Sequence, residues 1–534
     1  MNNIEILDST LRDGGYVNNW RFNSYTASKI VKSLNQANID IVELGYVNDT
    51  KGASIDSTLF SNIEDIKKIL YTNNTSRYVV MINYGDVNIE KVQYNQEIFG
   101  IRLAFHKKNW KKALIDAKNL IELGYNVLIQ PMLTINYSDI ELLQLINECN
   151  KLNIYAFYIV DSFGSMRQEE VLRLAYLIDN NLNKEVRIGL HCHNNLQLAY
   201  SNSIKFIESI YNRNLIVDTS VLGMGRGAGN LNTELFADYL IRVCGKNYKI
   251  QPLLDIIDSN LSIIYRDNYW GYSVGHYISA IYNCHPNYAT YLVEKKTLSI
   301  NKIEQIVKAI KDEKRANYDK KYIENLYTKY NSQTDTVKSM IKNLENYIKD
   351  NEVLLIAPGK SLLDYKEKIK SFMNSRNLIG ISVNHISDIV NTDFYFFSNE
   401  KRYNEYINQI NQLKIDNKII TTSNLKDFNS ILVNYKELLG ITHEAKDNSS
   451  IMLLNLLNKL KVKKVYIAGI DGYDYSENSY ISNNMELAYS KERVKNLNKD
   501  IKLELFNIKN NLEIEFITPS RFDLPTYMKE VAVD

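Results

Sequence analysis

Two short stretches of this chain hold the residue types that metal-assisted chemistry uses. An apolar run near the N-terminus leads into Asp8-Ser9-Thr10-Leu11-Arg12-Asp13-Gly14-Gly15-Tyr16, and far along the chain stands His191-Cys192-His193. Strand side chains alternate between two faces, so the two histidines point the same way and can share one metal ion, while Cys192 points away. Asp13 would add a carboxylate oxygen. The sequence therefore predicts a divalent-metal site with Arg12 beside it.

The elements that must position these residues alternate regularly up to about residue 235. Short apolar runs are separated by amphipathic segments of helical length, which predicts a (β/α)8 TIM barrel. Active sites of such barrels lie at the carboxyl ends of the strands. The unusual polar residues fall there: Arg12 and Asp13, Glu43, Asp161-Ser162, the two histidines, and the glycine-rich run 223–230. The expected strands are 4–7, 39–44, 78–82, 101–105, 126–130, 156–160, 187–190 and 216–221.

A second α/β pattern follows the barrel. Residues 236–350 read as helices, with aromatic interruptions at 269–272 and 284–288 that could cap the barrel mouth. From about residue 352, strands are expected at 353–357, 378–383, 393–397, 418–421, 464–470 and 513–518, with helices between them, as in a doubly wound sheet. We therefore expect a barrel with its cap over 1–300, a helical linker over 301–350 and a Rossmann-like domain over 351–534.

Composition limits the classes of function. The chain has 534 residues, of which 45% are hydrophobic and 24% charged, and its net charge of +2 gives no electrostatic reason to expect a nucleic acid as partner. Its four cysteines lack the paired spacing of a structural metal site or a disulfide framework, which favours a reducing compartment. No stretch approaches the roughly 20 apolar residues of a membrane span. We expect a cytoplasmic enzyme that forms a homo-oligomer.

The turn after the first strand of the second domain, Ala357-Pro358-Gly359-Lys360-Ser361, is similar to a phosphate-binding P-loop. The leading glycine of the P-loop pattern is absent, because Leu354 occupies its place. The sequence therefore excludes a P-loop ATPase. It leaves open a strand-to-helix turn whose backbone amides face some other anion.

Five motifs in order resemble the metal-dependent TIM-barrel aldolase and lyase family, which includes 4-hydroxy-2-oxoacid aldolases, hydroxymethylglutaryl-CoA lyase and isopropylmalate synthase. They are DSTLRDGG at 8–15, VELG at 42–45, VDSFG at 160–164, LHCHNN at 190–195 and GMGRGAGN at 223–230. The tail at 270–272 and 285–288 resembles the oxoacid aldolase branch, whose C-terminal helices cover the barrel. The resemblance implies Asp13, His191, His193 and Asn230 as metal ligands, Arg12 as the residue that steadies an enolate, and Ser162, Tyr272 and His285 as substrate contacts.

One departure from the family concerns the general base. The oxoacid aldolases carry a histidine three residues after the metal-binding aspartate, whereas this chain has Tyr16. A tyrosine with a pKa near about 10 is a poor base at neutral pH unless its surroundings lower that pKa. The base is therefore a tuned Tyr16, a metal-bound water, or a histidine of the cap, His276 or His285.

The second domain resembles bacterial sialyltransferase-like domains, which use a CMP-sugar donor. The resemblance rests on 353–362, 382–385, 392–396 and 465–473, although the G-x-G-P-S-L turn of that family is A-P-G-K-S-L here. It implies that Gly359, Ser361, Asn384 and Asp471 line a nucleotide or sugar site. The alternative is that these are turn residues of a sheet without a site.

These observations predict a class II aldolase. It would use Mn²⁺ or Mg²⁺, with Zn²⁺ or Co²⁺ as alternatives, to act on pyruvate or a related 2-oxoacid, with an aldehyde or a sugar as the second reactant. The nucleotide- or sugar-binding domain would connect it to surface-glycan synthesis. One rival is an acyl-CoA-dependent condensing enzyme, and another is a glycosyltransferase that uses the barrel as a scaffold. The presence of Arg12, Asp13 and both histidines argues against an inactive barrel.

Overall fold

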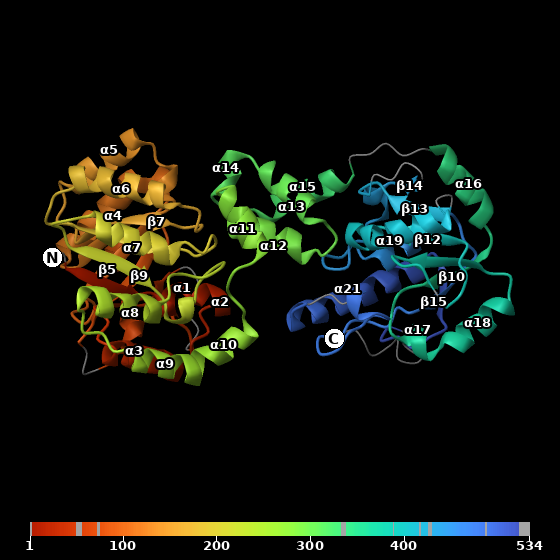
Figure 1. The fold of residues 1–534 in the computed structure, drawn as a ribbon, viewed down its shortest axis with the longest axis horizontal. Helices are drawn as coiled ribbons and strands as arrows, with labels where there is room; N and C mark the ends of the chain where they lie inside the picture. The colour runs from red at the N-terminus through yellow and green to blue at the C-terminus, as the bar shows by residue number, and fades with distance from the viewer. Residues whose placement is uncertain are drawn as a thin grey trace. The chain divides into compact units, whose positions relative to one another are not determined.

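The computed structural model divides into two compact units (Figure 1). The first unit comprises Met1–Thr290 with Ile310–Tyr318, and the second comprises Tyr291–Ala309 with Asp319–Asp534. The structure describes residues 3–49, 56–71, 75–332, 338–387, 389–415, 418–425, 430–485 and 489–522.

The first unit is built around a closed barrel of eight parallel strands. The strands follow one another in chain order, and pairing of β1 with β2 closes the ring. A short ninth strand, β3 (Leu59–Phe60), pairs with β2 outside the ring. The eight barrel strands are β1 (Ile4–Asp8), β2 (Ile41–Val47), β4 (Arg77–Asn83), β5 (Gly100–Phe105), β6 (Asn126–Pro131), β7 (Ala156–Asp161), β8 (Arg187–Cys192) and β9 (Leu215–Thr219). The prediction of a TIM barrel is confirmed.

The outer ring departs from a regular (β/α)8 pattern. A 3₁₀ helix over Ile63–Ile69 follows β2 and β3, and only a three-residue 3₁₀ turn, Ile89–Lys91, lies between β4 and β5. Residues 84–99 lack an apolar stripe at helical spacing, so they have no face to bury against the strands. The α-helices that cover the barrel are α3 (Ser24–Gln36), α4 (Trp110–Glu122), α5 (Asp139–Cys149), α6 (Gln168–Asn181), α7 (Ala199–Ser209) and α8 (Thr233–Cys244).

The segment after β1 forms two single-turn helices, α1 (Thr10–Asp13) and α2 (Gly15–Asn18), where the sequence suggests a loop. The Asp8 side chain starts this turn by accepting a hydrogen bond from the Thr10 amide at 3.0 Å. Gly14 has an ordinary helical φ of −59°, but a Cβ there would lie 2.3 Å from the Thr10 carbonyl oxygen. Glycine is therefore needed for close approach, and this packing holds Arg12 and Asp13 at the strand end.

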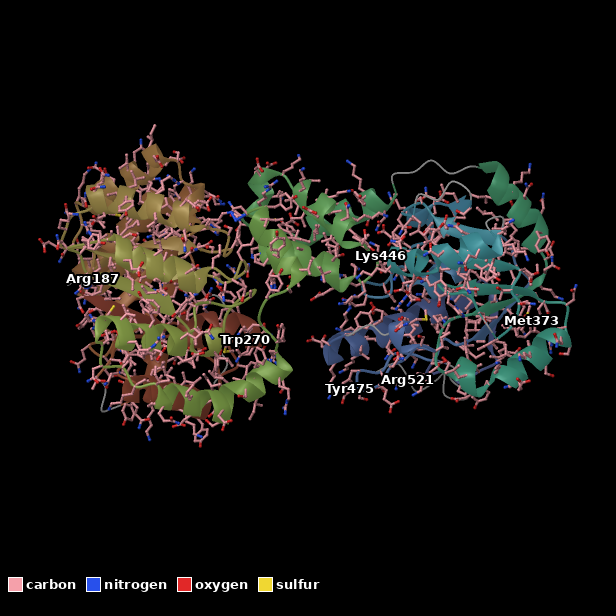
Figure 2. The ribbon with its side chains drawn as sticks, in the orientation of Figure 1. Arg187, Trp270, Met373, Lys446, Tyr475 and Arg521 are labelled. Atoms are coloured by element: carbon pink, nitrogen blue, oxygen red, sulfur yellow. The ribbon has the colours of Figure 1, made fainter. Side chains whose placement is uncertain are left out.

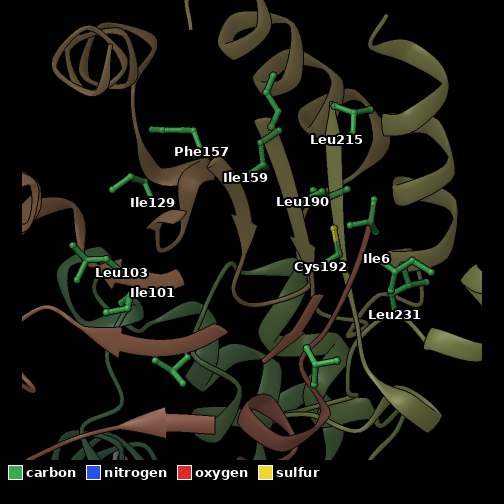
Figure 3. Packing of buried hydrophobic residues seen from close by; sticks show 14 of the residues in the cluster. Ile6, Ile101, Leu103, Ile129, Phe157, Ile159, Leu190, Cys192, Leu215 and Leu231 are labelled. Carbon is green, nitrogen blue, oxygen red and sulfur yellow. The ribbon is translucent and has the colours of Figure 1, made fainter. Parts of the chain in front are cut away.

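Strand alternation separates two apolar layers. Cys192, Leu190 and Ile6 belong to the layer between strands and helices (Figure 3), whereas Leu7 and Tyr158 fill the barrel interior. Cys192 thus points away from the interior, as the alternation of side chains predicts. The side chains that face inward near the carboxyl ends of the strands are the polar ones described below.

Helices that follow the barrel complete the first unit and begin the second. The interruptions at 269–272 and 284–288 lie between α10 and α11 and at the start of α12. Residues 301–350, expected as a linker, form most of α13 together with α14 to α16, and 333–337 lie outside the described residues. These helices are α9 (Gln251–Ile256), α10 (Ser262–Asp267), α11 (Val274–Ile281), α12 (Pro286–Glu294), α13 (Ile300–Lys308), α14 (Asp312–Arg315), α15 (Lys320–Asn331) and α16 (Lys338–Ile348).

The second unit contains a parallel sheet of seven strands in the order β14-β13-β12-β11-β10-β15-β16. The order reverses between β10 and β15, as in a doubly wound fold, so this prediction is also confirmed. The strands are β10 (Glu352–Ile356), β11 (Ile379–Val383), β12 (Phe394–Phe397), β13 (Ile419–Thr422), β14 (Ile431–Val433), β15 (Lys464–Ala468) and β16 (Glu513–Phe516). The helices are α17 (Ser361–Asp364), α18 (Lys366–Asn374), α19 (Glu400–Leu413), α20 (Ser449–Lys459) and α21 (Lys491–Lys509).

Within the described ranges, no helix has the length and apolar character that crossing a lipid bilayer requires.

Candidate metal centre

Asp13, His191 and His193 meet at the mouth of the barrel. The Oδ2 atom of Asp13 lies 3.5 Å from Nε2 of His191 and 3.5 Å from Nε2 of His193, and all three residues are buried. In the described part of the chain, this is the only group of three or more His, Cys, Asp or Glu side chains with ligand atoms close enough to share an ion. One carboxylate oxygen and two imidazole nitrogens form a donor set that suits a divalent metal.

Hydrogen bonds at the far side of each ring fix the histidine tautomers. Nδ1 of His191 lies 2.9 Å from Oδ2 of Asp218, and Nδ1 of His193 lies 3.2 Å from the carbonyl oxygen of Arg226. Because a carbonyl oxygen only accepts, Nδ1 of His193 carries the proton; the ionised carboxylate of Asp218 has the same effect on His191. Both Nε2 lone pairs therefore face Asp13, as metal binding requires.

Charge and burial keep the ligands in their metal-binding protonation states. Burial would raise the pKa of Asp13, but the surrounding positive charges, that of Arg12 first, together outweigh it and hold that pKa well below its usual range. Burial lowers the pKa of His193 to about 3, against the opposing charge of Asp13. A carboxylate and a neutral imidazole therefore coexist at neutral pH without competing for a proton.

Asn230 lies beside the Asp13-His191-His193 cluster. Its Nδ2 donates to Oδ2 of Asp13 at 2.7 Å, while its Oδ1 is buried and has no hydrogen-bond partner among the described residues. A buried amide oxygen without a partner is costly, and a cation beside it would remove that cost. Asp13, His191 and His193 therefore fit a metal ion, and Asn230 lies beside them.

A network of buried charges supports the cluster from inside the barrel. Nε of Arg12 lies 2.8 Å from Oε2 of Glu43, the same oxygen lies 2.7 Å from Nη1 of Arg102, and Arg102 also pairs with Asp218. Asp218 in turn holds His191. Sequence reasoning missed Arg102 and Asp218, although an arginine and an aspartate on the inward face of apolar strands are a usable signal.

Arg226 is a third residue whose role sequence reasoning missed, although it lies within the GMGRGAGN motif. Its Nη2 donates to the Ser162 carbonyl at 3.0 Å, and its guanidinium lies 5.4 Å from the centre of the Tyr16 ring. Its Nε is buried without a hydrogen-bond partner in the part of the chain that the structure describes. Arg226 therefore brings a cation with an unsatisfied donor to the mouth of the barrel.

The cap histidines differ in which ring nitrogen is free. Nδ1 of His276 lies 3.1 Å from the Gly271 carbonyl, so this nitrogen carries the proton and Nε2 is free to accept one. Nδ1 of His285 accepts from the Asn287 amide at 3.2 Å, and burial, followed by the charge of Arg226, lowers its pKa to about 3. His285 is thus a neutral Nε2–H donor, which suits a substrate contact and not a base.

His106 is a further histidine at the mouth that sequence reasoning missed. It directly follows β5 with extended backbone angles, φ −77° and ψ 149°, so it continues the inward face of Arg102 and Ala104. Burial lowers its pKa, with additional effects from Lys108 and Arg226. A signal was available, because the residue stands immediately after the fourth expected strand.

Tyr16 is not tuned toward a phenolate. Burial raises the pKa of its hydroxyl, and the nearby charges of Arg226 and Arg12 offset this only in part. Its ring packs edge-on against Trp20 at 4.6 Å, and 40% of the residue is exposed. The lowered pKa that a base role needs is absent, so Tyr16 is protonated at neutral pH and can donate a hydrogen bond.

Two expected substrate contacts lie in different surroundings. Ser162 is buried beside Arg226, and its Oγ accepts from the Leu133 amide at 3.1 Å. Tyr272 precedes α11 and is 51% exposed. Trp270, labelled in Figure 2, anchors this segment by donating its indole N–H to the Leu222 carbonyl at 3.0 Å. In the described residues, neither Tyr272 nor His276 hydrogen-bonds to the metal ligands.

The four candidate residues of the second unit do not all line one cavity. Asp471 accepts from the backbone amide of Ser361 at 2.7 Å and from its hydroxyl at 2.5 Å. A Cβ at Gly359 would lie 2.2 Å from the Gly469 carbonyl oxygen. Gly359, Ser361 and Asp471 therefore fasten the strand-to-helix turn. Gly359 and Asp471 also line a small cavity that adjoins the cleft lined by Asn384, which is described below.

Comparisons with known proteins agree with the geometry of the first unit. The model of the HMGL-like family matches residues 3–258. A 4-hydroxy-2-oxovalerate aldolase from Geobacillus genomosp. 3 is 28% identical over 245 residues, which cover 45% of this chain and 71% of the relative. The enzyme of the same name from Pseudoalteromonas translucida is 25% identical over 260 residues, which cover 47% of this chain and 75% of the relative.

Among solved structures, the N-terminal domain of a "putative aldolase" from Bacteroides vulgatus is similar with a TM-score of 0.51 and 29% identity, covering 56% of this chain and 99% of that domain. The matched region contains the barrel, the buried Asp13-His191-His193 cluster and all five motifs. Over this region, which is just under half of the chain, the chain is similar to the HMGL-like family and to the 4-hydroxy-2-oxovalerate aldolases named above.

Proposed function

We propose that the barrel is a divalent-metal aldolase for pyruvate or a closely related 2-oxoacid. The observation that carries the proposal is the buried Asp13-His191-His193 cluster, whose ligand atoms all lie within 4.8 Å of one another. The relatives' names, 4-hydroxy-2-oxovalerate aldolase, support a 2-oxoacid substrate. When bound, the metal supplies a Lewis acid that stabilises the enolate of the 2-oxoacid.

Two arginines of the chain assist this chemistry. Arg12 is fixed by Glu43 and stands 3.2 Å from Oδ1 of Asp13, so its charge is held beside the site at which the enolate oxygen gains charge. Arg226 presents its unpartnered Nε near Tyr16 and Ser162, where it can bind the carboxylate of a reactant. Together they orient the oxoacid and offset its negative charge.

We assign the general base to His106, with His276 as the second candidate. His106 lies on the inward face that continues β5, and its lowered pKa keeps its imidazole neutral and able to accept a proton. Tyr16, protonated at neutral pH, serves as a hydrogen-bond donor to the second reactant. The expected rate contribution of a positioned base is about 10²- to 10⁴-fold.

Proton exchange at the methyl group of pyruvate tests the proposal before a second reactant is known. With purified protein in D₂O, we expect Mg²⁺-dependent loss of the methyl proton signal by NMR, and Mn²⁺-dependent deuterium uptake by mass spectrometry. Asp13→Asn should abolish both the exchange and metal binding, while Arg173→Gln, on exposed α6, should leave both unchanged. Absence of exchange in wild-type protein with bound metal would contradict the choice of pyruvate.

The acyl-CoA-dependent alternative is separable in the same preparation. A condensing enzyme would release free thiol when acetyl-CoA and a 2-oxoacid are supplied together. An aldolase would release none, and it would instead cleave a 4-hydroxy-2-oxoacid to pyruvate and an aldehyde. Thiol release that depends on Asp13 would overturn the aldolase assignment.

A further inference from the structure

The second unit contains a cleft at the place where its strand order reverses. The sheet runs from β10 through β11 to β14 in one direction and through β15 to β16 in the other. Ligand sites of doubly wound sheets lie at the carboxyl ends of the strands beside such a reversal. Here a cavity of about 90 Å³ is lined by Pro358 after β10, Asn384 after β11 and Tyr473 after β15. All of its lining residues belong to the second unit.

Three cationic side chains line this cleft and are mostly buried. Lys295, Arg402 and Arg493 have side chains that are 8%, 7% and 17% exposed. The Lys295 ammonium has no hydrogen-bond acceptor among the described residues, and its nearest carboxylate oxygen, on Asp447, is 4.0 Å away. Within the same described ranges, Nε of Arg493 is buried without a hydrogen-bond partner. Unsatisfied buried donors of this kind are costly unless a ligand accepts from them.

The carboxylates of the cleft are held by other donors. Asp447 accepts from the hydroxyls of Tyr327 at 2.7 Å and Tyr435 at 3.4 Å. Glu444 lies 3.0 Å from Nδ1 of His443, and its other oxygen stays 3.7 Å from Nε of Arg493. These two carboxylates therefore do not satisfy the cations through hydrogen bonds. Arg402 is already satisfied, because it donates to Glu405 at 2.9 Å and to the carbonyl oxygens of Asn484 and Met485. Lys295 and Arg493 are therefore the cations of the cleft that keep donors without an acceptor.

Other groups around the cavity favour a phosphate over a simple carboxylate. The eleven-residue helix α20 begins at the cleft, and its N-cap Asn448 and first residues Ser449 and Ser450 line it. The positive end of a helix dipole adds to the cationic side chains and favours a doubly charged anion. Tyr473, Tyr480 and Tyr489 also line the cavity and offer aromatic surface to a ring attached to such an anion.

We propose that this cleft binds a phosphate-bearing small molecule, with Lys295 and Arg493 facing the phosphate. The three tyrosines would contact the sugar or base that carries it. The turn of Gly359 and Asp471 borders this site, because the cavity that these two residues line shares Tyr473 and Tyr480 with the cleft. The proposal stands independently of the aldolase function of the barrel.

Binding to the full chain tests the proposal directly. Calorimetry would compare inorganic phosphate, glucose 1-phosphate, CMP and UDP with glucose and cytidine, which lack phosphate. We expect at least one phosphate-bearing probe to bind with a dissociation constant below about 1 mM, and the matching phosphate-free compound to bind at least about tenfold more weakly. The proposal is overturned if none of the phosphate-bearing probes binds.

Variants locate the binding. Lys295→Met and Arg493→Gln should each raise the dissociation constant at least about tenfold, as expected for loss of a charge-assisted contact. Lys459→Met, at the exposed far end of α20, should change it by less than about twofold. Unchanged binding in both cleft variants would contradict the proposal.

Two further measurements separate this site from the barrel and from folding defects. In wild-type protein, the bound probe should protect Lys295 but not Lys459 from acetylation, as read by peptide mass spectrometry; equal labelling of Lys295 with and without probe would oppose the proposal. Asp13→Asn should retain binding of the probe, and Lys295→Met should retain pyruvate exchange. Binding lost in Asp13→Asn but kept in Lys295→Met would place the phosphate in the barrel.

Discussion

At the scale of single residues, the site controls protonation through hydrogen-bond partners. The same imidazole side chain serves different purposes because its partner differs: Asp218 and a carbonyl direct the lone pairs of His191 and His193 toward Asp13, and a backbone amide makes His285 a donor. Arg226 adds a positive charge that helps to keep His285 and His106 neutral. The role of each histidine can therefore be tested one at a time.

Replacing His106 by Gln should lower the rate of pyruvate proton exchange by at least about 100-fold, because the base is lost while metal binding is retained. His285→Gln should weaken substrate binding but leave exchange at saturating pyruvate within about tenfold. His443→Gln, an exposed histidine of the second unit, is the matched control. If His276→Gln lowers the exchange rate about 100-fold and His106→Gln leaves it unchanged, the general base is His276 and not His106.

The sequence predicted the metal cluster because its residues stand at recognisable places. Asp13 follows the first strand, and the spacing of His191 and His193 matches the two-residue period of a strand. The supporting pair Arg102 and Asp218 was missed because each lies within an apolar strand. The apolar run predicts the strand, but it does not tell which of its polar residues face the inside of the barrel. The placement of Arg226 depends on the path of a glycine-rich loop, which side-chain periodicity does not encode.

At the scale of elements, the loop after β9 positions Asn230 through close backbone packing. Gly229 has φ +86°, and a Cβ there would lie 2.1 Å from the Gly223 carbonyl oxygen. Gly245, the residue that ends α8, has φ +66°, and a Cβ added to it would meet no described atom within 4 Å. Alanine at Gly245 would therefore introduce backbone strain alone, whereas alanine at Gly229 would introduce backbone strain together with a steric clash.

Gly229→Ala should lower the free energy of unfolding of the barrel by about 2–5 kcal/mol, whereas Gly245→Ala should cost about 1–2 kcal/mol. Gly229→Ala should also weaken metal binding, because Asn230 is its direct neighbour. Urea unfolding followed by tryptophan fluorescence measures both variants. Equal destabilisation by the two substitutions would show that the loop can relax around the added methyl group.

The turn after β7 gives the barrel a dependence on pH. Asp161 accepts hydrogen bonds from the amides of Ser165 at 2.9 Å and Met166 at 3.1 Å, yet burial raises its pKa to about 7. The pKa is higher in the folded than in the unfolded chain, so protonation stabilises the fold. This contribution is fully present below about pH 4 and is lost as pH rises through about 7.

Relative to Asp161→Asn, wild-type barrel stability should therefore fall by about 1.4 kcal/mol for each pH unit between about 4 and 7. Urea unfolding at pH 4.5, 6.0 and 7.5 gives the comparison. Asp8, whose burial raises its pKa to about 6, contributes equally to both proteins and cancels in the difference. Identical pH slopes would mean that Asp161 has an ordinary pKa.

All eight barrel strands were predicted, because each is an apolar run bounded by polar segments. The short strands β3 and β14 were missed, since two or three residues carry no detectable period. Helical coverage was overestimated between β4 and β5, where length alone suggested a helix. The helical turns of α1 and α2 also escaped prediction, because they depend on tertiary packing around Gly14.

At the scale of the whole molecule, the two units carry different spectroscopic reporters. The three tryptophans of the chain, Trp20, Trp110 and Trp270, all belong to the first unit. Tryptophan fluorescence therefore follows the barrel alone, whereas circular dichroism follows both units. A ligand that binds one unit can be assigned to it by comparing the two signals.

Mn²⁺ or Mg²⁺ at about 100 times its dissociation constant should stabilise the barrel by about 2.7 kcal/mol. The unfolding transition seen by tryptophan fluorescence should move to higher urea concentration. A separate transition of the second unit, seen only by circular dichroism, should keep its midpoint. In Asp13→Asn the metal should have no effect. A metal-dependent shift that persists in this variant would show that the ion binds elsewhere.

The chain passes between the units three times, after residues 290, 309 and 318. Residues 310–318 thus belong to the barrel unit, where the Arg315 carbonyl accepts from the His285 amide at 2.9 Å and the Tyr288 hydroxyl donates to the Asn317 carbonyl at 2.8 Å. Residues 291–309 belong to the other unit. A protease that nicks the chain once between 309 and 310 would therefore leave two fragments, each holding a segment that belongs to the other fragment's fold. Such fragments should co-purify as one species. For the same reason, no single cut in the gene would yield a fragment that contains one complete unit and nothing of the other.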